Sequence, residues 1–417
     1  MVGKGEVPGV GRVLDEGRLR GIVSRALGDT WRAEGCHLRA AAAGLTGFLG
    51  DHFRATLTAR DSTGRTATLH LFIKSLPLTN KVKANFIDNN DYFRRETLMF
   101  RLFEELGGDD GPNPWRPKGY LYDDTILVMP DLAVDGFAPR PFLETLQLPD
   151  VLLTAASVAR FHAAFANYAT RKTVNPLRPY NFLEEHAEVL KEPTFCDSPF
   201  LHACARLSAN LINMYSAKYK DTIQDLEPKI FQLYLEACDT LRDYDSTLNV
   251  IIHKDLWINN IMFAPGKVVL VDYQCVRYGP PAFDLLSFLY LTTSREFRET
   301  HEKEVFLHYY SMFMKSVDGS TQHRLKDIGY DEEEFLRWCE ASRMFGLFFA
   351  ISIFPYVLMD PGAAQRYFDD PVTYEHYCNV DRTAPVTQHG RDCRPYLDRQ
   401  LVATEEFVER YLLKKVE

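Results

Sequence analysis

The first third of the chain carries its apolar residues in short, often alternating runs that are typical of β-strands. Residues 48–60 and 66–76 are rich in Thr, Phe and Ile and flank the turn 61–64, so we predict two strands joined by this turn. The segment YLYDDTILVMPDL at 120–132 predicts a second hairpin, with its turn at the two Asp residues. Between the hairpins, GGDDGPNPWRPKG at 107–119 predicts a loop.

Helical periodicity is confined to two segments of this first part and dominates after Pro149. The segment 13–28 predicts a short amphipathic helix, and 90–106 predicts another with Phe93 and Leu102 on or near one face. The other predicted helices cover residues 150–169, 199–217, 228–243, most of the chain from 282 onward, and 401–415.

A β-rich part is therefore followed by a helix-rich part, and the two join near 132–140. Because 417 residues are many for a single hydrophobic core, we predict two lobes and the α+β class. The expected boundaries are an N-lobe at 1–131 and a larger helical C-lobe at 132–417.

The longest apolar run, MFGLFFAISIFPYVLM at 344–359, has two interpretations. It is short for a membrane span and contains Pro355, so a buried core helix is favoured over a membrane helix. Its aromatic residues are expected to pack in the core, or alternatively to line an apolar pocket.

Charge and cysteine content narrow the class of protein further. The net charge of −9 argues against a general nucleic-acid binder, although one local phosphate pocket stays compatible with it. The eight cysteines are scattered between Cys36 and Cys393 without a CxxC pair, which indicates reduced thiols in the cytosol. The first residues, MVGKGEVPGVGRVLDE, contain no apolar signal core. We therefore expect a cytoplasmic protein without nucleic-acid or membrane partners; the oligomeric state is not indicated.

The segment VIIHKDLWINNIMF at 250–263 breaks an apolar run with polar residues, and this break predicts chemistry. Asp255 and Asn260 lie five positions apart between two short strands, and Asp272 ends the apolar run KVVLVDY. A tight hairpin through 264–266 would bring Asn260 and Asp272 together, and amide and carboxylate oxygens suit Mg²⁺. Asp255 would then accept or orient a substrate hydroxyl. The alternative is a polar turn whose side chains satisfy backbone groups.

Residues that would hold ATP occur in the matching order along the chain. The glycines Gly44, Gly47 and Gly50 precede the first predicted strand, and such a loop lets backbone N–H groups approach phosphates. Lys74 lies within the apolar run LHLFIKSL and would grip the α- and β-phosphates, with Glu96 as its ion-pair partner. Alternatively, Lys74 is an edge-strand lysine that points outward and Glu96 is a surface carboxylate.

The segment ILVMPDL at 126–132 fits the strand that enters the connection between lobes. Met129 and Asp131 are expected beside an adenine, although Asp131 equally suits a turn or helix cap. His253 is expected to hydrogen-bond the loop backbone rather than act as a base. Asp284 is expected to cap a helix or brace the catalytic loop.

The two segments HKDLWINNIMF and VDYQCVRYGPPAFDLLSFLY closely resemble the ecdysteroid kinase-like family of arthropods, also called CHK-type kinases. This family is related to choline kinases and aminoglycoside phosphotransferases. The residues that carry the resemblance are His253, Asp255, Leu256, Trp257, Asn259, Asn260, Asp272, Tyr273, Gln274, Asp284 and Leu285.

The resemblance implies a protein-kinase-like fold with a small nucleotide-binding N-lobe and a C-lobe that holds the catalytic loop and the acceptor. It also implies ATP-dependent phosphorylation of a hydroxyl on a small molecule, such as an ecdysteroid or a foreign compound.

Three further residues were compared with the family pattern: two differ from it and one agrees with it. Lys254 stands where the family often has Gly, so it would help to hold the phosphate or point to solvent. Ala55 stands where many members carry Ser, so a hydroxyl contact to phosphate is expected to be missing. Gln274 fits the family, and with the short stretch that follows it argues against a protein kinase.

We therefore expect an ATP- and Mg²⁺-dependent small-molecule kinase, with Asp255 as the catalytic residue. The alternative is a non-catalytic ATP-binding pseudokinase or small-molecule binder. The acceptor itself is not identified by these motifs.

Overall fold

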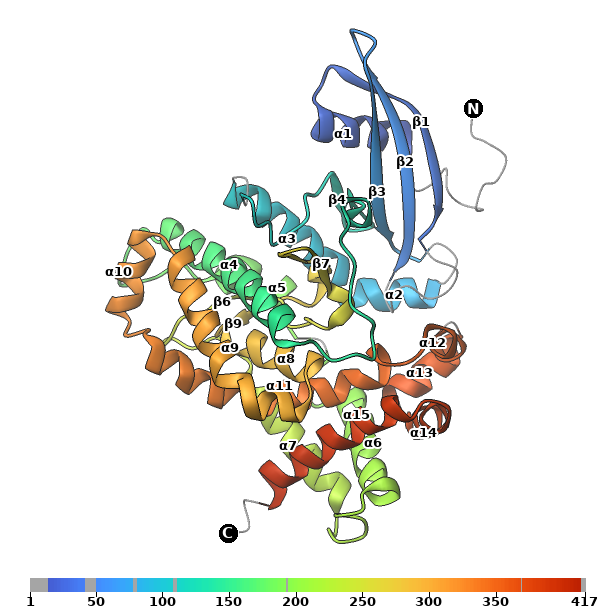
Figure 1. Ribbon diagram of the computed structural model, residues 1–417, viewed down its shortest axis with the longest axis vertical. Coiled ribbons are helices and arrows are strands. Elements are labelled where there is room, and N and C mark those ends of the chain that lie inside the picture. Colours follow the sequence, from blue (N-terminus) through green and yellow to red (C-terminus); the bar gives the residue numbers. More distant parts are fainter. Residues whose placement is uncertain are drawn as a thin grey trace.

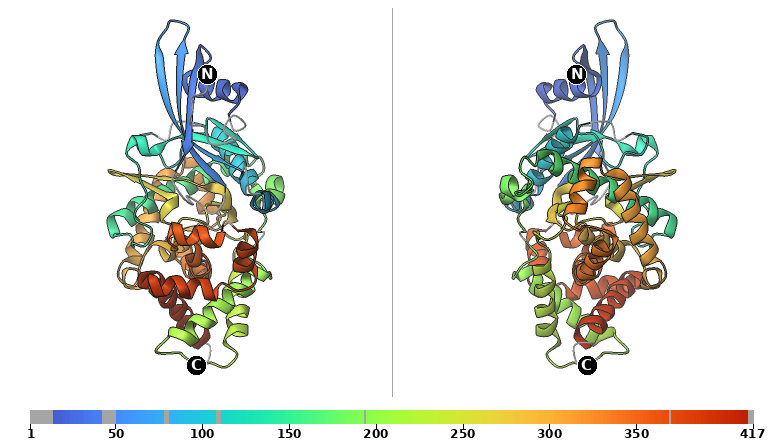
Figure 2. Two further views of the ribbon diagram at one scale, coloured as in Figure 1. Left: turned by 90° about the vertical axis from the view of Figure 1, so that its right-hand side faces the viewer. Right: turned by 90° about the vertical axis from the view of Figure 1, so that its left-hand side faces the viewer.

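The computed structural model describes residues 14–41, 50–77, 81–107, 111–192, 194–368 and 370–413. An antiparallel sheet with its helices lies at one end of an elongated molecule, and a larger helical part makes up the other end (Figures 1 and 2). The predicted α+β class, with a β-rich first part and a helix-rich second part, is confirmed.

The N-terminal sheet has the strand order β1-β2-β3-β5-β4, with antiparallel neighbours. Its strands are β1 Trp31–Ala40, β2 Asp51–Asp61, β3 Thr66–Ser75, β4 Leu121–Asp123 and β5 Ile126–Pro130. Both predicted hairpins, β2–β3 and β4–β5, are therefore present. Strand β1 was not predicted, because most of its residues are exposed and it lacks an alternating apolar pattern.

One face of this sheet forms a small core beneath helix α1, Glu16–Leu27. Alternate residues of β2, from Phe53 to Ala59, are buried, and they pack with Ile22, Leu71 and Val128. The alternation fixes which side of β2 faces the core and which faces away from it.

Two helices connect β3 to β4. Helix α2, Lys81–Asn89, is followed by α3, Tyr92–Leu106, which corresponds to the helix predicted at 90–106. Asp91 separates them with a left-handed backbone (φ 56°), so the helical hydrogen-bond pattern cannot continue through it. Phe93 and Glu96 of helix α3 are buried. The Glu96 carboxylate contacts Lys74 and the backbone of Tyr273, as described below.

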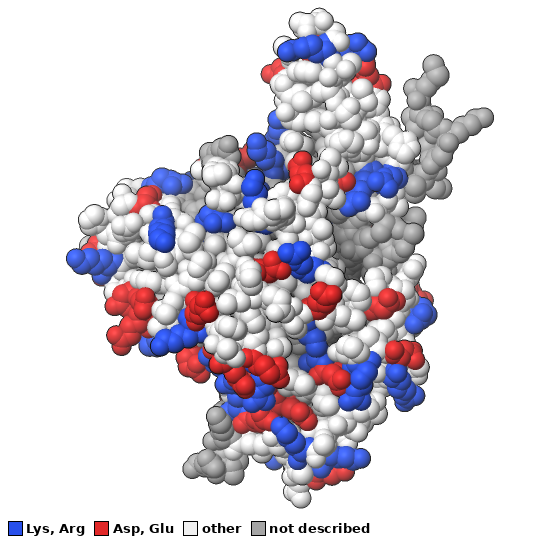
Figure 3. All heavy atoms as spheres, viewed as in Figure 1, with Lys and Arg blue, Asp and Glu red and all other residues white. Residues whose placement is uncertain are grey.

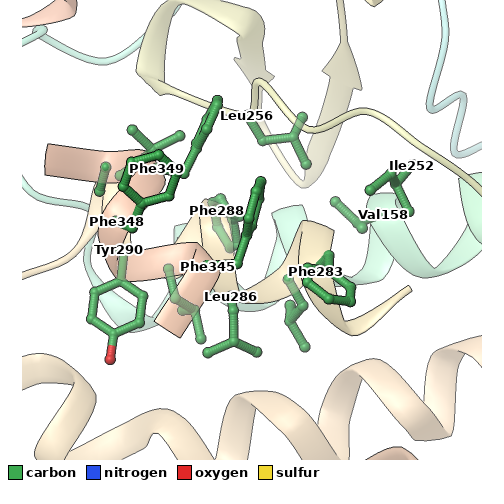
Figure 4. Close-up of a cluster of buried hydrophobic side chains, with 14 of the residues drawn as sticks. Val158, Ile252, Leu256, Phe283, Leu286, Phe288, Tyr290, Phe345, Phe348 and Phe349 are labelled. Atoms are coloured by element: carbon green, nitrogen blue, oxygen red, sulfur yellow. The ribbon is translucent and has the colours of Figure 1, made fainter. Parts of the chain in front are cut away.

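The helical part is built around a large aromatic core. Its longer helices are α4 Leu148–Lys172, α6 Pro199–Tyr215, α7 Leu226–Thr240, α8 Ala282–Thr292, α9 Arg295–Ser316, α11 Glu332–Val357 and α15 Arg394–Phe407. The shorter ones are α5 Phe182–Leu190, α10 Gly319–Asp327, α12 Pro361–Phe368, α13 Pro371–Asn379 and α14 Thr383–Asp392. Helix α8 is buried along its whole length, and Figure 4 shows Phe283 and Phe288 of this helix beside Phe345 and Phe348 of α11.

The apolar run 344–359 forms the end of α11 and the two residues after it, and it is largely buried in this core, as predicted. Among the described helices, none is by itself both long and apolar enough to cross a membrane. Helices α11 and α12 pass such a test only together, and a 90° bend separates them.

Short strands hold the polar break at 253–260. Strand β6, Val250–Ile252, pairs with β9, Arg277–Gly279, and β7, Ile261–Ala264, pairs with β8, Lys267–Leu270. The predicted hairpin through 264–266 is the β7–β8 turn. Because Ile261 pairs with Leu270, residues 260 and 271 are adjacent at the open end of this hairpin.

Candidate active site

A cavity of about 670 Å³ opens between the N-terminal sheet and the helical part. Lys74, Glu96 and Met129 line it from the first part, and Asp255 and Asp272 line it from the second. On the face shown in Figure 3, positive and negative side chains are interspersed around the junction of the two parts.

The polar loop that follows β6 is held by one buried carboxylate. Asp284 accepts hydrogen bonds from the backbone N–H groups of His253 (2.7 Å) and Lys254 (2.6 Å). The ring of His162 lies 3.0 Å from the same carboxylate and fixes its position. His253 Nε2 lies 3.0 Å from the carbonyl oxygen of Val271. Both residues therefore have the bracing roles that were predicted for them.

Asp255 follows this loop and is tied to Asn260. The Asn260 side-chain amide donates to the Asp255 backbone oxygen (2.8 Å) and to its carboxylate (3.1 Å). With the amide nitrogen used in this way, the Oδ1 atom of Asn260 is left for a ligand. Burial and the nearby charge of Asp272 raise the pKa of Asp255 to about 7, against the lowering effects of Lys254 and Lys74. A carboxylate with this pKa suits a general base.

Asn260 and Asp272 come together through the β7–β8 hairpin. The backbone N–H of Val271 donates to the Asn260 carbonyl oxygen at 3.0 Å, so Asp272 follows immediately after a residue bonded to Asn260. Asp272 has a left-handed backbone (φ 68°), which ends the strand and turns its side chain into the cavity.

These two residues fit a hard divalent cation in their donor chemistry. One amide oxygen and one carboxylate are oxygen ligands of the kind that Mg²⁺ takes, with water and phosphate supplying the rest. Within the described part of the chain, no group of three or more His, Cys, Asp or Glu side chains is arranged to hold a metal ion.

Lys74 lies at the centre of the charged network. Its Nζ contacts Glu96 Oε2 at 2.7 Å, Asp272 Oδ1 at 2.7 Å and Gln274 Oε1 at 2.9 Å. The predicted ion pair with Glu96 is thus present, and the other Glu96 oxygen accepts the Tyr273 N–H at 3.2 Å. Burial alone lowers the pKa of Lys74, but Asp272 and Glu96 together raise it above its usual value. Lys74 is therefore a buried, charged group at the cavity wall.

Of the three glycines predicted to cradle phosphates, Gly44 and Gly47 lie outside the described residues. Gly50 precedes β2 with φ +90°, and a Cβ placed there would lie 2.9 Å from the Ser75 carbonyl oxygen. Glycine is therefore required at this position by the backbone and by the close approach of β3.

Met129 and Asp131 both line the cavity at the connection between the two parts. The Asp131 carboxylate accepts the Ala133 N–H at 3.2 Å, as a cap of the short helix Leu132–Asp135, and it contacts Arg54 at 3.1 Å. Asp131 thus has the capping contact that was predicted as one of its two alternatives.

Two residues that depart from the family pattern have definite positions in the structure. Lys254 does not point to solvent, because it is 4% exposed and its Nζ lies 2.7 Å from Glu192. Its predicted contact with the phosphate stays a prediction. Ala55 faces the small core of the N-terminal sheet, because its position in β2 alternates with the residues that line the cavity. A hydroxyl at position 55 would therefore not reach the cavity.

The sequence did not indicate Glu192 and Phe195 as cavity residues. They lie in the loop between α5 and α6, about 60 positions before Asp255, and line the cavity next to Lys254. A Glu and a Phe in a loop carry no spacing or motif from which this position could have been predicted.

Comparison with known families identifies one match that covers the site. The model of the ecdysteroid kinase-like family matches residues 45–319, which include every candidate site residue except Gly44. The resemblance predicted from the sequence is therefore confirmed.

A methylthioribose kinase of Geobacillus kaustophilus is 25% identical over 179 residues. This match covers 41% of the chain and 42% of the bacterial enzyme, so the two are comparable over less than half of either length. The family and this relative are small-molecule kinases, in agreement with the predicted enzyme class.

Solved structures of low sequence identity also align with most of this chain. The amicoumacin kinase hAmiN in complex with AMP-PNP, Ca²⁺ and Ami is 11% identical, with 80% of this chain and 88% of that chain covered and a TM-score of 0.39. A choline kinase from Cryptosporidium parvum is 10% identical, with 90% and 94% covered and a TM-score of 0.38. At these TM-scores the likeness carries no argument about the site or its substrate.

Proposed function

Because the chain belongs to the ecdysteroid kinase-like family, we propose that it transfers a phosphoryl group from ATP to a hydroxyl group of a small molecule. One observation carries this proposal: Asp255, Asn260 and Asp272 line the same cavity as the buried pair of Lys74 and Glu96. We further propose an ecdysteroid, or a similar apolar metabolite or foreign compound, as the acceptor.

Asp255 is the proposed catalytic residue. It lies on the braced loop, and its raised pKa suits a group that accepts the proton of the acceptor hydroxyl or orients it. Asn260 and Asp272 would hold Mg²⁺, which would offset the negative charge of the phosphates. Lys74, held by Glu96, would contact the α- and β-phosphates once Asp272 is engaged by the cation.

The nucleotide and the acceptor would occupy different halves of the cavity. Met129 and Asp131 line the cavity on the side of the sheet, where we propose the nucleotide binds. Gly50, the described end of the glycine segment, immediately precedes β2 of this sheet. Residues 1–131 would then be the nucleotide-binding lobe and 132–417 the lobe that holds the catalytic loop and the acceptor, in a cytoplasmic enzyme.

The far half of the cavity supports an apolar acceptor. Phe195, Phe200 and Phe349 line it, and so do Ile353 and Tyr356. These aromatic and aliphatic side chains favour a ligand that buries apolar surface against them. Part of the apolar run in α11 therefore lines a pocket and the rest packs in the core.

The proposal is tested by incubating the purified protein with Mg·ATP and a panel of ecdysteroids and hydroxylated foreign compounds. We expect a phosphorylated product by mass spectrometry, and we expect Asp255→Asn to lower its rate by about 10²–10⁴-fold. The control is Asp245→Asn, an exposed carboxylate outside the cavity. Full activity of Asp255→Asn would overturn the catalytic role, and binding of Mg·ATP without transfer to any acceptor would support the non-catalytic alternative.

A further inference from the structure

We propose that the ion pair of Lys254 and Glu192 positions Thr194 and Phe195, together called the turn below, as a wall of the acceptor half of the cavity. The pair would govern acceptor binding and leave nucleotide binding unchanged. This assignment of the halves rests on the proposed function, whereas the positioning of the turn is a property of the structure alone.

Glu192 is the residue on which the contacts converge. One carboxylate oxygen, Oε2, lies 2.7 Å from Lys254 Nζ and 3.5 Å from Arg277 Nε. The other, Oε1, accepts the backbone N–H groups of Thr194 (3.0 Å) and Phe195 (3.1 Å). Although burial raises the pKa of Glu192, the charges of Lys254 and Arg277 lower it to about 2, so the carboxylate is ionised.

These contacts set the shape of the turn. Because both N–H groups bond to a single oxygen, Glu192 fixes the backbone that presents Thr194 and Phe195 to the cavity. The Phe195 ring then packs against Phe200 (centroids 5.5 Å apart) and Phe349 (5.2 Å). The turn is thereby joined to the aromatic wall on which an apolar acceptor would lie.

Lys254 connects this turn to the catalytic loop. Its backbone N–H is held by Asp284, and its Nζ lies 4.6 Å from the centre of the Phe195 ring, a cation–π contact. It also has a left-handed backbone (φ 68°), a conformation that is unfavourable for lysine and is maintained only where surrounding contacts impose it. A glycine at this position would make neither the ion pair with Glu192 nor the contact with the Phe195 ring.

The pair is separate from the groups proposed to hold the nucleotide. Lys254 bonds to Glu192, while Lys74 bonds to Glu96, Asp272 and Gln274. Lys254 immediately precedes Asp255, the residue proposed to face the acceptor hydroxyl. A change in the pair is therefore expected to reach the acceptor without altering the Lys74 network.

The test uses hydrogen–deuterium exchange of the full-length protein, read at the amides of Thr194 and Phe195. Lys254→Gly removes the ion pair and also relieves the backbone conformation, so the variant is expected to fold, and Glu192→Gln is the second variant. We expect exchange at both amides to be at least tenfold faster in each variant. The control is Lys191→Met, a half-exposed lysine one position before Glu192 that does not line the cavity.

Affinity for Mg·AMP-PNP is measured on the same proteins and is expected to stay within twofold of wild type. For any acceptor that the wild type phosphorylates, KM for the acceptor is expected to rise at least tenfold while KM for ATP is unchanged. Unchanged exchange in both variants, or an equal loss of nucleotide affinity, would overturn the inference. Failure of the proposed function would show separately, as absence of phosphoryl transfer by the wild-type protein.

Discussion

At the residue scale, Asp255 is held in a position that disfavours its charge. Burial and Asp272 raise its pKa from 3.8 to about 7, so the folded protein keeps a proton on this group that the unfolded chain releases. Such an arrangement lowers stability progressively as the pH rises from about 4 to about 7, and the full cost remains above pH 7. Strain of this kind is common where a group must react.

We therefore predict that Asp255→Asn stabilises the protein, and more so at pH 8 than at pH 5. The asparagine does not titrate, so it avoids the cost that the wild type bears above pH 7. The measurement is the midpoint of thermal unfolding at both pH values, without nucleotide or metal. Asp245→Asn, at an exposed position, should show no such difference. An equal effect at the two pH values would contradict a raised pKa for Asp255.

A second prediction at this scale concerns Glu96 and the affinity of the protein for Mg·ATP. With Glu96→Gln, Lys74 keeps Asp272 as its charged partner, so the cation must compete with Lys74 for that carboxylate. We expect affinity for Mg·ATP to fall by about tenfold, the order of one charged hydrogen bond. Isothermal titration calorimetry measures this affinity. Glu104→Gln, an exposed carboxylate on the same helix, should leave it unchanged.

At the scale of elements, the close approach of the start of β2 to the end of β3 depends on Gly50. We predict that Gly50→Ala lowers the free energy of unfolding by about 2–3 kcal/mol, from positive φ and from the contact with the Ser75 carbonyl. Gly64→Ala in the β2–β3 turn has a similar φ (+87°) but no atom within 4 Å of the added Cβ, so it should cost only about 1 kcal/mol. Urea denaturation measures both values. Equal costs would show that the Ser75 contact is unimportant.

Most elements could be predicted from the sequence because their patterns are local. The β2–β3 hairpin, helix α3 and the β7–β8 hairpin each have regular periodicity or a clear turn. Strand β1 could not be predicted, since only its pairing with β2 makes it a strand and most of its side chains are exposed. Helix α2, which precedes the helix predicted at 90–106, was also not predicted.

Site residues that lie close together in the sequence could also be predicted, whereas those placed by tertiary packing could not. Asp255, Asn260 and Asp272 could be predicted because they lie within 18 positions of one another, on either side of the β7–β8 hairpin. Glu192 could not, since its place beside Lys254 depends on how the loop after α5 packs against the catalytic loop. The side of β2 on which Ala55 lies was not predicted, because it depends on the exact alternation along this strand.

At the scale of the whole molecule, the nucleotide is expected to join the two parts. Mg·ATP at 100 times its Kd should stabilise the protein by about 2.7 kcal/mol, which for a chain of this size raises the unfolding midpoint by about 3 °C. ATP without Mg²⁺ should have a smaller effect. In the Asp272→Asn variant, the unfolding midpoint measured with ATP should be the same with and without Mg²⁺. The Asp245→Asn variant should show the same increase with Mg²⁺ as the wild type. A Mg²⁺ effect that survives Asp272→Asn would place the cation elsewhere.

The most direct measurement is a crystal structure of the protein with Mn²⁺ and a non-hydrolysable ATP analogue, in which anomalous scattering locates the metal. We predict the metal between Asn260 Oδ1 and the Asp272 carboxylate, with Lys74 moved from Asp272 to the phosphates and the γ-phosphate facing Asp255. A metal bound without Asn260 and Asp272, or an analogue outside this cavity, would contradict the account.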